Sequence, residues 1–251
     1  MKNSGKKKIF FAGMIIIAIW LFLVNLVPYL GAKDGLSDQE IIKRFHQIYY
    51  GNTLLWSEKT TWLGVVCEQT PHDNWMMQEI IYEIKPDFII ETGTYKGGSA
   101  LFYATVLDHV NKDGKVITVD IENQLDRKAS KQEIFMKRVE FILGDSVSQK
   151  VINTIDKKVK NHTVLVTLDS LHTKEHVLKE LKLYSNFVSV GSYIIVQDTN
   201  INGHPVFPAF GLGPMEAVEE FLKTDDRFII DHNREKFLIT FYPSGYLKRV
   251  K

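Results

Sequence analysis

The sequence is poor in cysteine, because Cys67 is the only one among 251 residues. An intrachain disulfide cannot form, and no group of cysteines and histidines has the spacing of zinc ligands. We interpret Cys67 as a small apolar filler. The lack of disulfides fits a reducing compartment, but many exported bacterial proteins also lack them.

The sequence also lacks an excess of charge of either sign, since 31 Lys and Arg residues face 30 Asp and Glu residues. Binding to a nucleic-acid backbone requires a basic surface, so nucleic acid is not expected as a partner. No repeat or low-complexity stretch interrupts the chain. With 45% hydrophobic residues, this length predicts one globular domain and leaves no room for a second large one.

Charged residues are absent from residues 9–30, which follow a basic tail at residues 1–8. A helix of about 20 residues crosses the hydrocarbon core of a membrane. We therefore predict a single-pass transmembrane anchor, whose basic end faces the cytoplasm. The alternative is a cleaved signal peptide ending near Gly31 and Ala32, but the apolar run is longer than a usual signal core.

Residues 31–72 are predicted to form a helix followed by a loop. Ser37 and Glu40 have the spacing of a capping box. The helix then carries an apolar stripe that should pack on the domain or lie near the membrane, formed by Ile41, Phe45 and Ile48. The loop contains Trp56 and Trp62, which we expect in core or lid packing, or at an aromatic-lined entrance.

From residue 73 onward, helical segments alternate with short apolar runs. Asp73 is the predicted N-cap of a helix through Ile84. The predicted strands are Asp87–Glu91, Lys115–Asp120, Val139–Leu143, Thr163–Leu168 and Tyr193–Val196. The segments Ala100–Val110, His176–Tyr184 and Met215–Leu222 have helical spacing. Such alternation predicts an α/β fold whose mostly parallel sheet is covered on both faces. Phe228–Ile230 and Phe237–Phe241 should add a C-terminal antiparallel hairpin.

Polar residues follow the first three strands, where open parallel sheets bind their ligands. The first strand leads into a glycine-containing loop that permits close approach of a cofactor, formed by Glu91, Gly93, Thr94, Tyr95, Gly97, Gly98 and Ser99. Asp120 ends the second strand and can bind ribose hydroxyls, and Asp145 and Ser146 follow the third, near an adenine ring. Each feature alone is ordinary turn chemistry, but together they favour a nucleotide-like cofactor.

The glycine spacing does not give G-x-G-x-x-G, which weakens a dinucleotide-binding interpretation. Instead, the loop resembles the first motif of class I methyltransferases, and its form E-x-G-x-Y-x-G-x-S is similar to that of catechol-type, metal-dependent O-methyltransferases. The resemblance implies a Rossmann-like methyltransferase domain over residues 73–251, with S-adenosylmethionine as its cofactor.

Two carboxylates, Asp169 and Asp198, follow the fourth and fifth strands, where they could hold a hard cation such as magnesium or simply face solvent. The strings D-S-L-H-T-K-E-H-V, Q-D-T-N-I-N-G-H-P-V, G-L-G-P-M-E-A-V and R-E-K-F-L-I-T-F-Y-P-S-G-Y-L look like the cephalosporin hydroxylase and rhamnosyl O-methyltransferase family from about Trp62 to Arg249.

This resemblance implies that Asp169, Gln197 and Asp198 bind the metal. Gln197 stands where the family usually has Glu, so the site should hold its cation more weakly. His172 takes the position of the lysine base in catechol-type enzymes, which implies a general base beside Asp169. His204, in the long loop of residues 200–213, is a candidate contact to the substrate.

The sequence thus predicts a metal-assisted O-methyltransferase acting on a hydroxyl, for which the resemblance and the anchor suggest a sugar of a cell-surface glycoconjugate or glycolipid. A hydroxylase is the rival enzyme class, and a catalytically silent binding module is the rival non-enzyme. The charge rule would place the domain outside the cytoplasm, whereas the cofactor is made inside, so the side of the membrane stays open. A homo-oligomer is also left open.

Overall fold

The computed structural model describes residues 35–251, in which a first unit ends at Arg44 and a second comprises Phe45–Lys251. The predicted anchor at residues 9–30 lies outside the described residues. Among residues 35–251, no helix is both long enough and apolar enough to cross a membrane.

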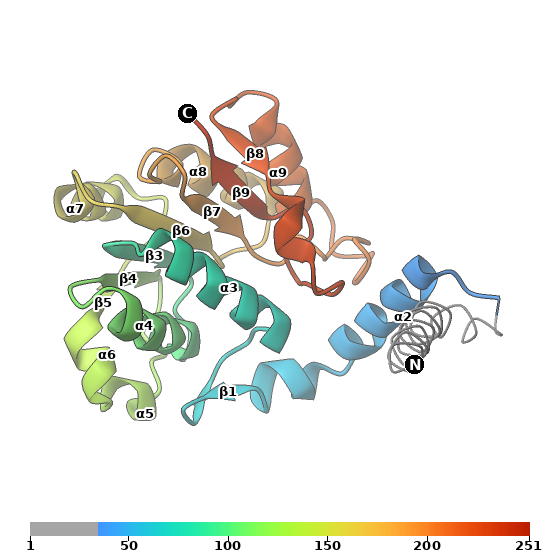
Figure 1. Cartoon of the computed structure of the whole chain (residues 1–251), viewed down its shortest axis with the longest axis horizontal. Helices are drawn as coiled ribbons and strands as arrows, with labels where there is room; N and C mark the ends of the chain where they lie inside the picture. Colours follow the sequence, from blue (N-terminus) through green and yellow to red (C-terminus); the bar gives the residue numbers. More distant parts are fainter. Residues whose placement is uncertain (1–34) are drawn as a thin grey trace, which may run out of the picture. The chain divides into compact units, whose positions relative to one another are not determined.

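Seven strands form the central sheet of the second unit (Figure 1). In chain order they are β3 (Phe88–Thr92), β4 (Lys115–Asp120), β5 (Val139–Leu143), β6 (Val164–Leu168), β7 (Tyr193–Val196), β8 (Phe228–Ile230) and β9 (Tyr246–Arg249). Their spatial order is β5-β4-β3-β6-β7-β9-β8. The first five are parallel, and β9 runs antiparallel to both β7 and β8.

The remaining elements precede the sheet or connect its strands. The helices are α2 (Asp38–Gly51), α3 (Pro71–Ile84), α4 (Gly98–Val110), α5 (Arg127–Ser130), α6 (Glu133–Arg138), α7 (Gln149–Val159), α8 (Lys174–Tyr184) and α9 (Pro214–Leu222). Shorter elements are the π-helical turn η1 (Leu54–Glu58), the 3₁₀ turn η2 (His232–Glu235), and a two-stranded ribbon of β1 (Thr61–Trp62) and β2 (Val65–Val66).

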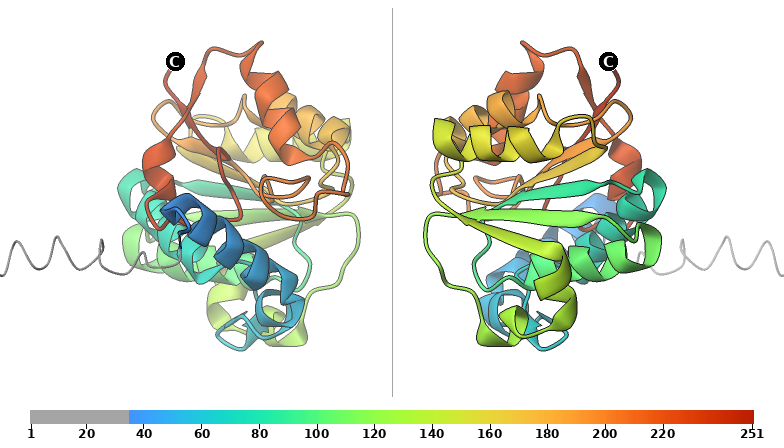
Figure 2. Two further views of the ribbon diagram at one scale, coloured as in Figure 1. Left: turned by 90° about the vertical axis from the view of Figure 1, so that its right-hand side faces the viewer. Right: turned by 90° about the vertical axis from the view of Figure 1, so that its left-hand side faces the viewer.

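Helices cover both faces of the sheet, as Figure 2 shows. Alternate strand residues enter different cores: Ile89 and Val116 pack with residues of α3 and α4, whereas Ile90 and Ile117 pack with residues of α7, α8 and α9. This division explains why the strands are apolar throughout rather than alternating. The predicted α/β fold with a mostly parallel sheet and antiparallel C-terminal strands is confirmed.

The C-terminal hairpin differs from the prediction. Phe237–Phe241 is not a strand, and β9 forms later, at Tyr246–Arg249, between β7 and β8. The reason is the buried carboxylate of Asp73, which accepts hydrogen bonds from the Phe241 backbone N–H (2.9 Å) and the Tyr246 hydroxyl (3.0 Å). The ring of Phe241 is thereby held in the core beneath α2, stacked on His46 at 5.7 Å.

Asp73 is therefore not the N-cap of α3, as predicted from the sequence. The helix begins at Pro71, and the Thr70 side chain caps it by accepting a hydrogen bond from the Asp73 N–H (3.0 Å). A threonine followed by proline at the first helical position is a common start signal, so the sequence contained the correct cap three residues before the predicted one.

The capping box of α2 forms as predicted, with Ser37 and Glu40 exchanging hydrogen bonds. The predicted apolar stripe does not pack inward, because Ile41, Phe45 and Ile48 are 50%, 50% and 62% exposed. His46 and Tyr50 face the core instead. The helical period was correct, but the buried face is the one that carries His46 and Tyr50.

Candidate active site

A cavity of about 520 Å³ opens at the carboxyl ends of β3, β4, β5, β6 and β7. This is where ligands bind in open parallel sheets. Ten of the residues selected from the sequence line it: Gly93, Thr94, Tyr95, Ser99, Asp120, Asp145, Ser146, Asp169, His172 and Asp198. The other selected residues, Glu91, Gly97, Gly98, Gln197 and His204, are not among its lining residues.

The carboxylate of Asp120 holds the loop after β3 in shape. One of its oxygens accepts hydrogen bonds from the backbone N–H groups of Thr94 and Tyr95, both at 2.9 Å. The other accepts from the Glu122 N–H at 3.0 Å. Because Asp120 also faces the cavity, it can shape the loop and present oxygen to a ligand at the same time.

All three loop glycines are required by the protein's own packing, and a Cβ added to Gly98 would lie 2.0 Å from the backbone oxygen of Val66. Gly93 has φ +87°, and a Cβ added to it would lie 1.8 Å from the backbone oxygen of Asp169. Gly97 has φ +83°, and its Cβ would meet the Leu125 side chain at 2.8 Å. A side chain at Gly97 would therefore displace Leu125 rather than fill the cavity, so the cofactor-contact role expected for Gly97 is indirect in this geometry.

Glu91 lies behind the same loop and is fully buried. Burial raises the pKa of its carboxyl to about 8, although the hydrogen bond from Thr118 opposes the shift. Thr118 donates to Glu91 at 2.5 Å and lies 2.6 Å from the Thr94 hydroxyl. The second Glu91 oxygen has no hydrogen-bond partner among the described residues. Through Thr118, Glu91 of β3 is thus linked by hydrogen bonds to β4 and to Thr94 of the loop.

The loop after β5 is connected to α8 through His176. The Ser146 hydroxyl lies 3.2 Å from His176 Nε2, which is 3.4 Å from the buried carboxylate of Glu180. Ser170 also donates to that carboxylate, at 2.8 Å. Both polar contacts of His176 use one nitrogen, so the arrangement is not a hydrolase triad, in which the two imidazole nitrogens contact different groups.

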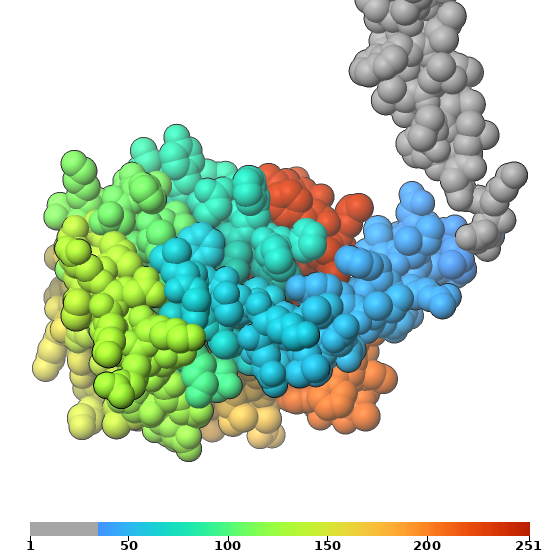
Figure 3. Space-filling model, turned by 90° about the horizontal axis from the view of Figure 1, so that it is seen from below, coloured from blue at the N-terminus to red at the C-terminus, as the bar shows by residue number. Residues whose placement is uncertain are grey.

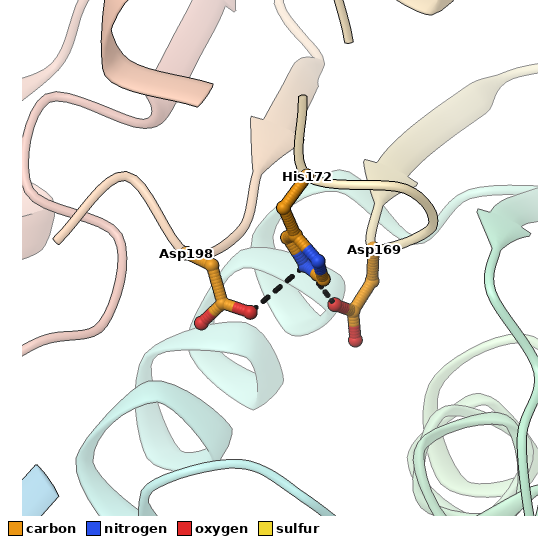
Figure 4. A group of neighbouring side chains, drawn as sticks. All are labelled: Asp169, His172 and Asp198. Carbon is orange, nitrogen blue, oxygen red and sulfur yellow. Dashed lines mark hydrogen bonds and ion pairs between the residues drawn. The ribbon is translucent and has the colours of Figure 1, made fainter. Parts of the chain in front are cut away.

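The charged centre of the cavity consists of Asp169, His172 and Asp198 (Figure 4). His172 Nε2 lies 3.3 Å from an Asp169 oxygen and 2.8 Å from an Asp198 oxygen. One potential ligand atom from each of the three residues lies within 4.8 Å of the others. Two carboxylate oxygens and an imidazole at this spacing can surround one divalent cation.

The electrostatics of this group are strongly coupled. Burial alone would lower the pKa of His172, but the charges of Asp198 and Asp169 and their hydrogen bonds raise it well above its ordinary value. Burial, together with the charge of Asp198, raises the pKa of the Asp169 carboxyl. In this arrangement the imidazolium balances two carboxylates, and a cation bound between them would take over that role.

Gln197 lies beside this group but is turned into the protein. Its side chain is buried, and its oxygen accepts hydrogen bonds from Tyr242 (2.6 Å) and Gln69 (3.3 Å). Its amide nitrogen donates to Thr167 at 2.7 Å. Both ends of the amide are occupied by protein groups, so the structure does not bring Gln197 together with Asp169 and Asp198 as a ligand.

His204 binds the start of α9 rather than the cavity. Its Nε2 lies 3.0 Å from Glu216, which also accepts from the Gly213 N–H at 2.7 Å. Against the effect of burial, these hydrogen bonds lower the pKa of Glu216 to about 2. His204 thus fixes the loop of residues 200–213, and its substrate contact remains only a prediction.

Glu68 and Trp56 are cavity residues that were not among the site residues selected from the sequence. Glu68 lines the cavity, and burial together with the charges of Asp169 and Asp198 raises its pKa to about 7. Trp56 lines the cavity as well, which matches the aromatic-lined entrance. Trp62 instead packs on Phe102, with ring centroids 4.9 Å apart. Neither Glu68 nor Trp56 follows a strand of the parallel sheet, so a search of strand ends could not find them.

Comparison with known proteins identifies the family. The model of the Rhamnosyl O-methyltransferase/CmcI family matches residues 54–250. The chain belongs to this family. Rhamnosyl O-methyltransferase of Mycobacterium tuberculosis (strain H37Rv) is 38% identical over 237 residues, which cover 90% of this chain and 93% of the relative. The Mycobacterium leprae protein of the same name is 38% identical over 218 residues, covering 83% and 90%. The predicted enzyme class, an O-methyltransferase, is thereby confirmed.

Solved structures show the same fold at lower identity. A CmcI structure described with Mg-SAM has a TM-score of 0.57 and 18% identity, and covers 76% of this chain and 77% of its own. The O-methyltransferase from Bacillus cereus in complex with SAH has a TM-score of 0.53 and 14% identity, and covers 89% and 96%. These likenesses support the Rossmann-like methyltransferase architecture.

Proposed function

We propose that this member of the family is a metal-assisted, S-adenosylmethionine-dependent O-methyltransferase that acts on a sugar hydroxyl. The observation that carries the proposal is the position of the Asp169–His172–Asp198 group in the same cavity as the loops after β3, β4 and β5. A methyl donor and an acidic, cation-binding centre would then share one cavity. Relatives that are 38% identical are named rhamnosyl O-methyltransferases, which supports the sugar.

The cofactor would be held by the half of the cavity formed by Thr94, Tyr95, Ser99, Asp120 and Asp145. These residues fit the cofactor. It carries ribose hydroxyls and an ammonium group, and this half of the cavity offers carboxylate oxygens together with the backbone of the loops after the strands. When bound, it would supply an electrophilic methyl group. The protein's contribution is to hold the acceptor oxygen in line with it.

Asp169 and Asp198 would hold magnesium, which when bound acidifies and orients the acceptor hydroxyl. The donor set fits a hard cation, since both residues offer carboxylate oxygens. Asp169 and Asp198 favour the protonated form of His172. With their charge neutralised by a bound cation, His172 would lose its proton and could then accept the proton of the acceptor hydroxyl at Nε2. The group contains one imidazole, so it does not resemble the two-His-one-carboxylate iron site of hydroxylases.

We also propose, on the sequence alone, that residues 9–30 anchor the enzyme in a membrane and that the acceptor belongs to a cell-surface glycoconjugate or glycolipid. Extraction of membranes with alkaline carbonate tests the anchor, because an integral protein stays in the pellet. A variant lacking residues 1–30 is the comparison. Equal release of both proteins would contradict the anchor.

A direct assay tests the function. The full chain is incubated with S-adenosylmethionine labelled in its methyl group, magnesium, and methyl α-L-rhamnopyranoside or the matching glucoside and mannoside. Label should appear in a sugar methyl ether. If a panel of sugar glycosides accepts no label while a catechol does, the sugar assignment is wrong. If label reaches no hydroxyl at all, although the cofactor binds by calorimetry, the transferase assignment itself fails.

A further inference from the structure

A second hollow, of about 480 Å³, lies beside the active-site cavity. One side is formed by Tyr50 at the end of α2 and by Trp56 of η1, and the other by residues 205–208 of the loop after β7. In Figure 3 the cyan segment that contains η1 and the orange loop lie next to each other on this face. Apart from Gln47 and Thr53, the side chains around it are apolar or aromatic. We call this hollow the aromatic groove.

The aromatic groove and the active-site cavity share a wall. Trp56 lines both of them. Its ring stacks on Tyr50 with centroids 5.1 Å apart, and its indole N–H donates to the Tyr50 backbone oxygen at 2.9 Å, which fixes the pair. Burial raises the pKa of Tyr50 to about 12, and the charge of Asp198 adds to the shift. Because Trp56 belongs to both, the groove adjoins the cavity in which the acceptor hydroxyl would react.

Phe207 lines the groove with an exposed ring and an unfavourable backbone conformation. It is 52% exposed and has φ +44°, a backbone conformation that residues with a side chain rarely adopt. The neighbouring backbone is held by a hydrogen bond from the Gln47 amide to the Pro205 oxygen (3.1 Å). The ring of Phe207 packs against Phe210 with centroids 5.6 Å apart, yet about half of the residue stays in contact with water beside an apolar surface. Such costs are typical of binding sites.

We propose that the aromatic groove binds the apolar substituent of the acceptor, an alkyl or aryl chain attached to the sugar whose hydroxyl is methylated. The proposal rests on the function proposed above and extends it from the reacting sugar to the rest of the acceptor. The chemistry of the occupant follows from the lining, which offers apolar contact and almost no hydrogen-bonding partners. Because Trp56 lines both the cavity and the groove, a chain attached to a sugar in the cavity can extend directly into the groove.

The proposal predicts a dependence on chain length, because each methylene buried in such a groove strengthens binding about fourfold. The full chain is assayed with methyl α-L-rhamnopyranoside and with octyl α-L-rhamnopyranoside, the latter below its micelle concentration. These compounds differ only in the substituent. The octyl compound should have a KM at least about tenfold lower, since even two to three buried methylenes suffice.

Phe207→Asn is the test variant, because asparagine tolerates a positive φ and removes the ring. The ratio of the two KM values should fall toward one. Leu238→Asn is the matched control: Leu238 is also exposed (69%) and also has a positive φ (+69°), but it lines neither the cavity nor the groove. This variant should keep the ratio of the parent.

A binding measurement separates this proposal from the function on which it rests. Saturation-transfer NMR with octyl α-L-rhamnopyranoside reports contact of the alkyl protons with the protein whether or not methyl transfer occurs. Strong transfer to the alkyl chain, lost in Phe207→Asn and kept in Leu238→Asn, supports the groove even if no rhamnoside is methylated, in which case only the sugar assignment fails. Equal KM values for both glycosides, or equal effects of the two substitutions, overturn the groove. A dimer in sedimentation analysis that Phe207→Asn dissociates would assign the groove to a second copy and would also overturn it.

Discussion

The two halves of the active-site cavity are built in different ways. On the side of β3, β4 and β5, polar side chains mainly bind the backbone, as Asp120 does with the N–H groups of Thr94 and Tyr95. On the side of β6 and β7, charged side chains bind one another, as His172 does with Asp169 and Asp198. The first half therefore has a backbone held in one shape, whereas in the second half the charge of one imidazole opposes the charges of two carboxylates.

This difference separates binding from turnover. Disturbing the first half should change the affinity for the cofactor, because a preformed loop surface is lost. Disturbing the second half should change the rate, because in the proposed mechanism its charges act on the hydroxyl that loses a proton. The predictions below test this separation in order of decreasing effect.

Removal of divalent cations should have the largest effect. A metal that polarises the nucleophile contributes several kcal/mol, so excess chelator should reduce turnover about a thousandfold or more, and magnesium should restore it. Asp169→Asn and Asp198→Asn should raise the magnesium concentration needed for half-maximal activity, whereas Asp113→Asn, on the surface, should not. Calorimetry should show cofactor affinity unchanged within about twofold. Full turnover in chelator would remove the metal from the mechanism.

His172→Gln should reduce kcat by about a hundredfold to ten-thousandfold, the usual contribution of a general base. The rate of the parent should rise with pH, because only the neutral imidazole accepts a proton. Since the carboxylates raise the pKa of His172, this rise should shift to lower pH as magnesium saturates and neutralises them. His232→Gln is the control, because His232 also pairs with a carboxylate, Glu235, at 2.8 Å, but lies outside the cavity. A loss below about tenfold would assign proton removal to the metal alone.

Asp120→Ala should weaken cofactor binding by about 10- to 150-fold, the effect of losing a charge-assisted hydrogen bond worth about 1.5 to 3 kcal/mol. At saturating cofactor, kcat should stay within about threefold of the parent. Calorimetry and steady-state kinetics measure the two quantities. If kcat falls as strongly as affinity, the two halves of the cavity are not separable.

His46 provides a smaller test, which concerns stability rather than chemistry. Burial lowers its pKa from 6.5 to about 4 in the folded protein, so the unfolded chain binds the proton more readily. Its contribution is therefore complete above pH 6.5 and is lost as the pH falls to about 4, a change of up to about 3 kcal/mol. Urea unfolding should show a shallower loss over this range for His46→Gln than for the parent. Parallel profiles for the two proteins would contradict this account.

Most of the sheet could be predicted because its signal is local. Lys115–Asp120, Val139–Leu143 and Tyr193–Val196 are strands with the predicted bounds, since apolar runs between turns have few alternatives. The first strand of the C-terminal hairpin, Phe228–Ile230, also has the predicted bounds. The second strand was misplaced because its position depends on Asp73, 168 residues before Phe241 in the sequence. No local pattern shows that a buried carboxylate will hold Phe241 out of the sheet.

The site follows the same division. Strand ends meet at one edge of a parallel sheet, so Asp120, Asp169 and Asp198 could be placed together from topology alone. Side-chain direction could not be predicted, and Gln197, next to Asp198, turns inward to Tyr242. Glu68 and Trp56 reach the cavity from the segment before α3, whose path no strand pattern defines.

The close contact between Gly93 and the Asp169 backbone has a consequence for evolution. Because the loop proposed to carry the methyl donor touches the main chain of Asp169, a proposed metal ligand, the relative position of the two reacting groups would be inherited with the sheet. Residues 205–208 belong to the loop after β7 and line the aromatic groove. Under the proposals above, a lineage could exchange one acceptor for another by altering exposed side chains of this loop, such as Phe207, while the reaction is conserved.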